Sequence, residues 1–249
     1  MVIGIIPARY AATRLPGKPL IDLNGQTMVE RVWRAAVASA SVDRVIVATD
    51  DQRIVDACAT FGAEACMTDP DLPAGTDRCE AVVRTLRLQP DIVINIQGDE
   101  PLLHPSILTQ LVQALRSSNA DVSTPVSRLL FADELDDPAV VKVARAADGH
   151  AVYFSRSPIP FSRDVDRAAW LQTRPYWRHI GIYAYTLQAL RRHVSLPPSP
   201  LERAESLEQL RLLEAGARFA CVETDHVLLS VDTPADADRV RAYLREHGL

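Results

Sequence analysis

The chain has 249 residues, of which 47% are hydrophobic and 24% charged, and its formal net charge is -5. This composition is typical of a globular protein with one large core, and it excludes the disordered and fibrous classes. The negative charge argues against a general nucleic-acid binder, so an anion site needs a local concentration of cations. The apolar start is too short for a signal-peptide core and no apolar run approaches membrane-spanning length, so we expect a cytoplasmic protein without membrane insertion.

Three apolar, β-branched runs in the first half predict strands that are buried on both faces, as in a parallel sheet. They cover residues 2–6, 44–48 and 91–96. A helical pattern lies between the first two, where Thr27 is a candidate cap with Glu30 three residues on. The first half is therefore predicted to follow a β-α-β-α-β order.

The pattern changes after about residue 120, where closely spaced strand patterns leave no room for crossover helices. Residues 157–175 read as a long loop, 179–185 as a strand, 199–216 as one amphipathic helix and 234–248 as a terminal helix. We predict an α/β fold with a mostly parallel central sheet, helices on both faces and a mixed or antiparallel extension. Residues 1–249 would form a single domain with an excursion over about 125–185.

The stretch "IIPARYAATRLPGKPL", residues 5–20, places Arg9, Arg14 and Lys18 at the end of the first predicted strand. In an open α/β sheet, ligands bind beyond the carboxyl ends of the strands, and arginine suits phosphate oxygens. Gly17 would let the backbone approach a ligand. The alternative is a solvated basic loop. Neither GxxxxGK[ST] nor GxGxxG occurs, which argues against a Walker-type ATPase and a dinucleotide oxidoreductase.

Two acidic motifs also follow predicted strands. In "NIQGDEP", Asp99 and Glu100 come directly after the strand at 91–96, and in "LLSVDTPADAD", Asp232 precedes a helix. Each motif could simply cap the segment that follows, with Thr233 as the other candidate for the second cap. If Asp232 faces Asp99, the two carboxylates and a triphosphate could hold one or two Mg²⁺ ions.

Other polar groups cluster in two further regions. "AGTDR", residues 74–78, is either a helix cap or a contact to a base or sugar. The segments "FSR", "RHIGIY" and "LEQLR" offer hydrogen-bonding groups, although a lone histidine is more often structural and Glu208 with Arg211 could be a surface ion pair. The four cysteines form no CxxC pair, so neither a zinc site nor a disulfide framework is predicted.

These motifs together resemble the 3-deoxy-manno-octulosonate cytidylyltransferase family. The resemblance is carried in order along nearly the whole chain by "IIPARYAATRLPGKPL", "VATDD", "AGTDR", "NIQGDEP", "YFSRSPIP", "RHIGIYAY", "SPLERAESLEQLR" and "VDTPADADRVR". It implies a Rossmann-like nucleotidyltransferase fold, a homodimer, Mg²⁺ dependence, and CTP and 3-deoxy-D-manno-octulosonate (Kdo) as substrates for lipopolysaccharide biosynthesis. The sugar-binding and dimer regions would fall in the 125–185 excursion.

The resemblance also implies roles for individual residues. Catalysis would depend on Lys18, Arg14, Asp99 and Asp232, the last two of which would also bind the metal. Nucleotide contacts would come from Pro7, Ala8, Arg9, Arg14, Lys18, Ala74, Gly75, Thr76, Arg78, Gln97 and Asp99, and sugar contacts from Arg156, His179, Tyr183, Glu208 and Gln209. The chain departs from the family pattern at Asp77, where glutamate is expected, and before "VDTP", where a glycine is common.

Three alternatives stay open at this point. The acceptor could be another α-keto acid sugar, 8-amino-Kdo or a sialic acid. The chain could instead be a non-catalytic nucleotide-binding module, which has no need for a metal pair. A metal-dependent glycosyltransferase would favour a D-x-D pair, whereas Asp50 and Asp51 are adjacent.

Overall fold

The structure is a computed structural model that describes residues 1–11 and 15–249. The chain divides into two compact units, which are described separately. The first unit comprises Met1–Thr109 and His226–Leu249, and the second comprises Gln110–Asp225. The prediction of one domain over residues 1–249 stays a prediction.

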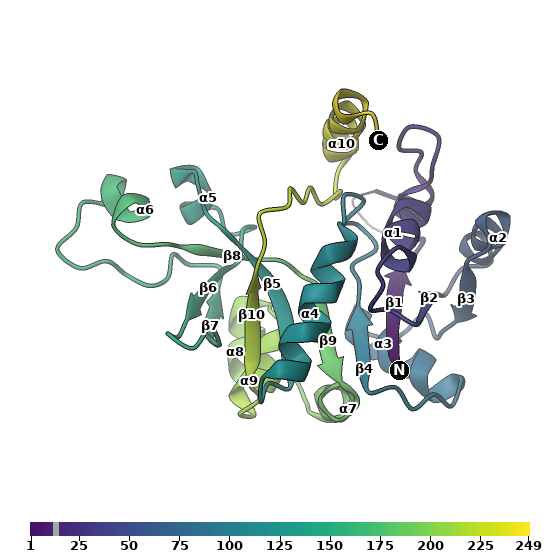
Figure 1. The fold of residues 1–249 in the computed structure, drawn as a ribbon, viewed down its shortest axis with the longest axis horizontal. Coiled ribbons are helices and arrows are strands. Elements are labelled where there is room, and N and C mark those ends of the chain that lie inside the picture. Colours follow the sequence, from purple (N-terminus) through teal and green to yellow (C-terminus); the bar gives the residue numbers. More distant parts are fainter. Residues whose placement is uncertain (12–14) are drawn as a thin grey trace. The chain divides into compact units, whose positions relative to one another are not determined.

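The first unit is built on parallel strands in the order β3-β2-β1-β4 (Figure 1). These are β1 (Val2–Ala8), β2 (Arg44–Thr49), β3 (Glu64–Met67) and β4 (Ile92–Asn95). All four residues of β4 are buried, and β1 and β2 each have a single partly exposed residue. The three strands predicted from continuous apolar runs are confirmed, and β3 is an additional edge strand.

The helices of the first unit begin where the sequence supplies side-chain caps. Thr27 accepts from the Glu30 backbone N–H at 3.3 Å and starts α1 (Met28–Val37). Asp51 accepts from the Arg53 N–H at 2.9 Å and starts α2 (Gln52–Phe61). The remaining helices are the 3-10 helix η1 (Lys18–Leu20), α3 (Gly75–Thr85) and α10 (Pro234–His247), with the unit boundary falling inside α4 (Pro105–Ser117).

The second unit has a mixed sheet around β5, which confirms the predicted change of pattern. β5 (Val122–Arg128) pairs in parallel with β10 (Phe219–Glu223) and antiparallel with β8 (Trp177–His179) and β9 (Tyr183–Thr186). β6 (Lys142–Arg145) pairs antiparallel with β7 (Ala151–Ser155) and β8. The helices are α5 (Ala132–Asp136), η2 (Arg167–Ala169), α6 (Trp170–Thr173), α7 (Leu187–Ser195), α8 (Pro200–Glu205) and α9 (Gln209–Glu214).

Three element predictions in this unit are wrong in detail. The single helix expected over 199–216 is broken into α8 and α9 because Ser206 adopts a left-handed conformation with φ 52°. The strand expected over 179–185 is interrupted between β8 and β9. The loop expected over 157–175 contains η2 and α6, and Trp170 is buried and stacks on Tyr176 with ring centroids 5.8 Å apart.

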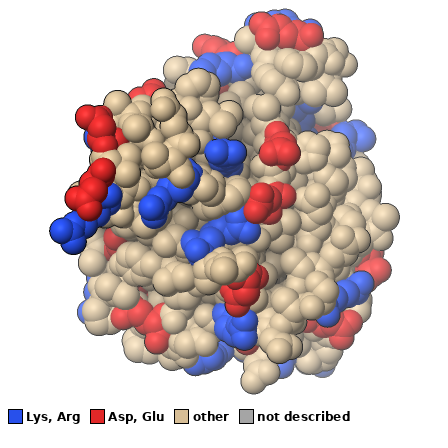
Figure 2. Space-filling model, turned by 60° about the vertical axis from the view of Figure 1, so that its left-hand side comes forward, with Lys and Arg blue, Asp and Glu red and all other residues tan. Residues whose placement is uncertain are grey.

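Three properties bear on the expectations drawn from composition: the surface charge, the state of the cysteines and the length of the apolar helices. Figure 2 shows basic and acidic side chains interspersed over the face that it draws. The four cysteines are free and buried. Among the described helices, none is both long and apolar enough to span a membrane.

Candidate active site

The centre of the candidate site is one lysine held by two aspartates from distant parts of the first unit. Lys18 Nζ donates to Asp99 Oδ2 at 2.7 Å and to Asp232 Oδ1 at 2.9 Å. The Lys18 side chain is 15% exposed, and those of Asp99 and Asp232 are 27% and 39% exposed. The structure therefore brings together the basic loop after β1, the turn after β4 and the segment before α10.

The charge of this lysine is fixed by its two partners. Burial lowers the pKa of Lys18, but the charges and hydrogen bonds of Asp99 and Asp232 outweigh burial and hold the pKa above its ordinary value. The ammonium group is therefore charged throughout the physiological pH range. Two carboxylates and one ammonium give the cluster a net charge of about -1.

The Asp232 segment is hydrogen-bonded to the turn after β4, so that Asp99 and Asp232 both contact the Lys18 side chain. The Val231 N–H donates to the Asp99 carbonyl at 3.0 Å, and Ser230 Oγ donates to Glu100 Oε1 at 2.6 Å. Thr233 Oγ1 accepts from the Asp236 N–H at 3.3 Å and caps α10. Of the two candidates for that cap, Thr233 takes the role, and Asp232 binds Lys18.

Gly98 allows the β4 turn to lie directly against the end of β1. A Cβ atom added at this position would be 2.7 Å from the Pro7 carbonyl oxygen and 3.5 Å from Ile6 Cγ2. Real Cβ atoms essentially never approach a backbone atom so closely. The missing side chain thus sets the position of the neighbouring Asp99. Gln97, in the same turn, is partly exposed.

The "AGTDR" segment forms the first turn of α3, with Ala74 as its N-cap residue. Gly75 lies close to Pro7, since an added Cβ would be 3.3 Å from Pro7 Cγ. Asn95, the last residue of β4, donates from Nδ2 to Thr76 Oγ1 at 3.2 Å. The segment is therefore packed against the carboxyl ends of β1 and β4, which is the edge where the sequence predicts a ligand.

Arg78 is fully buried and is held by partners that the sequence did not indicate. Its guanidinium forms an ion pair with Asp50 at 3.2 Å and donates to Thr68 Oγ1. Burial lowers the pKa of Arg78, the negative charge of Asp50 raises it, and the positive charge of Arg9 lowers it further. The only sequence feature that indicates this pair is the position of Asp50, which directly follows a predicted buried strand in "VATDD".

The basic loop is described apart from residues 12–14. Gly17, with φ 71°, caps η1, and its N–H donates to the Tyr10 carbonyl at 2.9 Å. Arg53 stacks over the Tyr10 ring at 3.3 Å. Among the described residues, Arg9 Nη2 is buried without a hydrogen-bond partner. The predictions made for Arg14 fall outside the described residues.

Pro7 and Ala8, the other residues predicted from the same motif, form the carboxyl end of β1. Ala8 is buried and pairs with Thr49 of β2. Pro7 lies next to both Gly75 and Gly98, as described above. The basic loop, the turn after β4 and the start of α3 therefore all meet at the carboxyl end of β1.

The residues predicted to bind a sugar acid all lie in the second unit. His179 Nε2 is 3.0 Å from Thr124 Oγ1, and burial lowers the pKa of His179 to about 3, so the imidazole is neutral. The His179 and Tyr183 rings are 5.3 Å apart. Burial raises the pKa of Tyr183 well above its ordinary value, and the charges of Tyr185 and Glu208 add to the effect. The His179 and Tyr183 rings are therefore neighbours.

Arg156 holds the backbone that leads from α8 to Glu208. Its guanidinium donates to the carbonyls of Glu205 at 2.7 Å, Pro138 at 2.8 Å and Ser206 at 3.2 Å. The Arg156 N–H also donates to the Glu205 carboxylate at 2.9 Å. Within the described part of the chain, Arg156 thus serves as a brace for this corner, and its predicted sugar contact stays a prediction.

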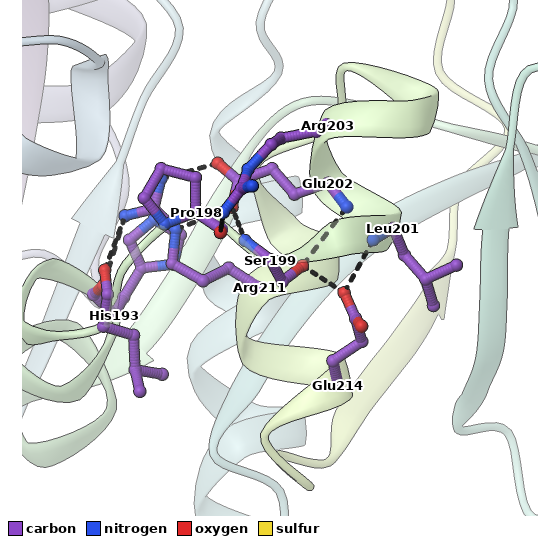
Figure 3. A network of polar contacts seen from close by, with 9 residues as sticks. His193, Pro198, Ser199, Leu201, Glu202, Arg203, Arg211 and Glu214 are labelled. Carbon is purple, nitrogen blue, oxygen red and sulfur yellow. Dashed lines mark hydrogen bonds and ion pairs between the residues drawn. The ribbon is translucent and has the colours of Figure 1, made fainter.

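A second polar network fixes the start of α9, where Glu208 and Gln209 lie. Arg211 donates to Glu202 through two bonds of 2.8 and 2.5 Å, and Ser199 caps α8 (Figure 3). Gln209 is buried, and its Nε2 atom has no hydrogen-bond partner among the described residues. A buried amide donor without a partner is costly, which makes Gln209 suited to a ligand oxygen.

Asp99 and Asp232 are the residues whose chemistry fits a metal ion. Among the described residues, no group of three or more His, Cys, Asp or Glu side chains could hold one. Mg²⁺ is commonly bound by one or two carboxylates together with substrate phosphates and water. A pair of carboxylates at the edge of a parallel sheet matches that type of site.

A parallel sheet with cationic and acidic groups converging at the carboxyl ends of β1 and β4 is the arrangement expected for an enzyme that acts on a nucleotide. The family model described as "Cytidylyltransferase" matches residues 3–219, and this defines the chain as a cytidylyltransferase. A 3-deoxy-manno-octulosonate cytidylyltransferase from Syntrophotalea carbinolica is 46% identical over 248 residues, covering 98% of each chain. One from Halorhodospira halophila is 47% identical, covering 97% of this chain and 96% of the relative. The chain belongs to the 3-deoxy-manno-octulosonate cytidylyltransferase family.

A solved structure supports the same assignment. It is described as CMP:2-keto-3-deoxy-manno-octonic acid synthetase complexed with CTP, and it is 41% identical to this chain. The TM-score is 0.91, with 99% of each chain covered. The predicted α/β nucleotidyltransferase fold is confirmed by this likeness.

Proposed function

We propose that this chain transfers CMP from CTP to the anomeric hydroxyl of Kdo and releases pyrophosphate. The observation that carries the proposal is the Lys18–Asp99–Asp232 cluster at the sheet edge of a chain in this family. The product, CMP-Kdo, would be the activated sugar for lipopolysaccharide biosynthesis in the cytoplasm.

The reaction needs positioning and charge stabilisation from the protein, and no covalent enzyme intermediate. The Kdo hydroxyl oxygen forms a bond to the α-phosphorus of CTP, and the bond from that phosphorus to the bridging oxygen breaks, so that the bridging oxygen leaves with the electron pair as part of pyrophosphate. The hydroxyl proton passes to water. Lys18 and Arg14 would offset the negative charge that builds up on the leaving pyrophosphate. When bound, Mg²⁺ would supply further charge neutralisation and lower the pKa of the attacking hydroxyl.

Asp99 and Asp232 would hold the metal, and the surrounding loops would hold the nucleotide. Gly75 and Gly98 give the backbone two places of close approach at the end of β1. The tight turn after β4 would place Gln97 beside the cytidine, with Ala74 and Thr76 at the start of α3. Pro7, Ala8 and Arg9 would complete the phosphate side of the same pocket, and Arg78 would lie with Ala74 and Gln97 on the side of the cytosine and ribose.

The proposed sugar site consists of Arg156, His179, Tyr183, Glu208 and Gln209. The neutral state of His179 and Tyr183 supports hydrogen bonding to sugar hydroxyls over proton transfer. Gln209 would donate from its buried amide to an oxygen of the acid. Arg156 would supply positive charge toward the carboxylate while it braces the backbone.

We also propose a homodimer that uses the second unit. Exposed large apolar side chains in this unit support the proposal, because apolar surface that gathers into a patch marks sites of protein–protein contact. The most exposed are Leu130, Phe131, Val152 and Phe161, between 60% and 75% exposed. Sedimentation equilibrium would give twice the chain mass of 27.4 kDa if the proposal is right.

An acceptor comparison tests the substrate assignment. Purified chain, CTP and Mg²⁺ are mixed with Kdo, 8-amino-Kdo or a sialic acid, and pyrophosphate release is followed. The proposal predicts that Kdo gives the highest kcat/KM. A higher value with 8-amino-Kdo or a sialic acid would assign the chain to that acceptor, and CTP binding without any release would indicate a non-catalytic nucleotide-binding module.

A further inference from the structure

The Lys18 ammonium group lies between the two carboxylates that are proposed to bind the metal. Its Nζ atom is within hydrogen-bonding distance of one oxygen of Asp99 and one oxygen of Asp232. The same side chain is proposed to stabilise the triphosphate. One cation is thus assigned to two places, and it can be in only one of them at a time.

A metal ion and this ammonium group compete for the same oxygens. Mg²⁺ binds carboxylate oxygens at about 2.1 Å, so an ion on the two oxygens that Lys18 contacts, Asp99 Oδ2 and Asp232 Oδ1, would overlap with the ammonium group. The two positive charges would also repel each other strongly at this separation, since the cluster is only partly exposed. A metal that uses these two oxygens can therefore bind only after Lys18 has moved.

Lysine is able to make that move if another anion is offered. Its ammonium is a compact charge on a flexible four-carbon stem, so it can exchange partners without a change in the backbone. The backbone of η1 is itself fixed, because the Lys18 N–H donates to the Leu15 carbonyl at 3.1 Å and the Leu20 N–H to the Gly17 carbonyl at 2.8 Å. A triphosphate at this sheet edge would be a stronger anionic partner than either aspartate.

We propose that Lys18 occupies the metal position in the nucleotide-free protein and moves to the triphosphate when CTP binds, so that the divalent metal binds Asp99 and Asp232 only together with nucleotide. This inference rests on the proposed function. Lys18 keeps the two aspartates paired in the free protein, and it couples metal binding to nucleotide binding. Metal loading is therefore ordered by the substrate.

Binding of Mn²⁺, measured by electron paramagnetic resonance without nucleotide, tests the exchange. The variants are Lys18→Met, which keeps the length of the side chain, and Lys18→Gln, which keeps a hydrogen-bond donor. Without the lysine charge, we expect Mn²⁺ to bind on the order of tenfold more tightly, or better, than to the unaltered chain. Adding Asp99→Asn to either variant should abolish the gain. Thermal unfolding identifies any variant that fails to fold.

Arg84→Met is the matched control, since it removes one positive charge from the same unit. Arg84 is 71% exposed and contacts Glu80 at 3.5 Å. This variant should bind Mn²⁺ as the unaltered chain does. Equal nucleotide-free affinity in the Lys18 variants and the unaltered chain would overturn the exchange.

Water-proton relaxation with Mn²⁺ and CTP together separates this inference from the proposed function. The unaltered chain should show a ternary complex that depends on CTP and is lost in Asp99→Asn. If no such complex forms, the proposed metal site is wrong. If Mn²⁺ binds the unaltered chain through Asp99 equally well with and without CTP, the metal site stands and the role of Lys18 is wrong.

Discussion

Replacing Gly98 by alanine tests how the active-site turn is built. The added Cβ would be 2.7 Å from the Pro7 carbonyl oxygen, a backbone atom that belongs to β1. A flexible side chain could move aside, but this carbonyl cannot move without shifting the strand. The substitution must therefore push the turn that carries Asp99 away from β1.

The size of the effect follows from this geometry. Overpacking of a well-packed site costs about 1–3 kcal/mol, and for a chain of this length each kcal/mol lowers Tm by roughly 2–4 °C. A displacement of about 1 Å at a reacting group can lower the rate by about a hundredfold. We therefore expect Gly98→Ala to lose stability modestly and to lose kcat strongly.

Gly4→Ala, in the strand β1 that Gly98 contacts, is the matched control. Its added Cβ would be 3.0 Å from Ile96 Cδ1 and 3.4 Å from Val42 Cγ1, both of which are side-chain atoms. This variant should lose stability while keeping kcat. Scanning calorimetry and pyrophosphate release give the two quantities. Gly98→Ala with an unchanged Tm and kcat would refute the reasoning.

Three further changes have defined outcomes. Asp99→Asn should lower kcat about a hundred- to a thousandfold without unfolding the chain, because it removes one charge from the reacting centre; pyrophosphate release and circular dichroism measure this. Glu202→Gln should destabilise the chain by about 3–5 kcal/mol in urea unfolding, because Arg211, whose side chain is 9% exposed, loses the negative charge of Glu202. His193 is buried, and burial and the charge of Arg211 lower its pKa to about 4. As the pH is lowered from 6.5 to about 4, this imidazole binds a proton in the unfolded chain but not in the folded chain, so the free energy of unfolding should decrease.

Each of these outcomes can be contradicted. Near-normal turnover of Asp99→Asn with Mg²⁺ would remove Asp99 from the metal site. The double variant Glu202→Leu, Arg211→Met should recover most of the stability lost by Glu202→Gln, and an equally unstable double variant would place the loss elsewhere. His193→Leu should reduce the difference in unfolding free energy between pH 7 and pH 5, and an unchanged difference would exclude His193 as its source.

The sequence predicted the strands that are buried on both faces and missed the one that is not. Residues 2–6, 44–48 and 91–96 form mostly apolar runs because β1, β2 and β4 are buried on both faces. β3 is an edge strand in which only Cys66 is buried, while Glu64 and Met67 are exposed. A half-exposed strand of four residues carries little hydrophobic periodicity, so it could not be identified.

The break between α8 and α9 could not be predicted from periodicity either. Apolar spacing continues through residues 199–216, but Ser206 has φ 52°, a conformation more often taken by glycine. At the break, Arg156, which follows the distant strand β7, donates to the Glu205 and Ser206 carbonyls. Such a tertiary contact overrides the local helical preference.

The active-site residues were predictable as strand-end groups, but their pairing was not. The sequence places Lys18 in a basic loop and Asp99 and Asp232 in two acidic motifs. It does not indicate that one ammonium joins both carboxylates, because residues 18, 99 and 232 meet only in the folded chain. The Arg78–Asp50 pair was missed for the same reason.

The central claim is tested most directly by an omission experiment on pyrophosphate release. The chain is incubated with CTP, Kdo and Mg²⁺, with each component left out in turn, and with ATP, GTP or UTP in place of CTP. The account predicts rapid release only when CTP, Kdo and Mg²⁺ are all present, with CMP-Kdo formed in equal amount. Release that continues without Kdo, or that is equally fast without added metal in the presence of a chelator, would contradict it.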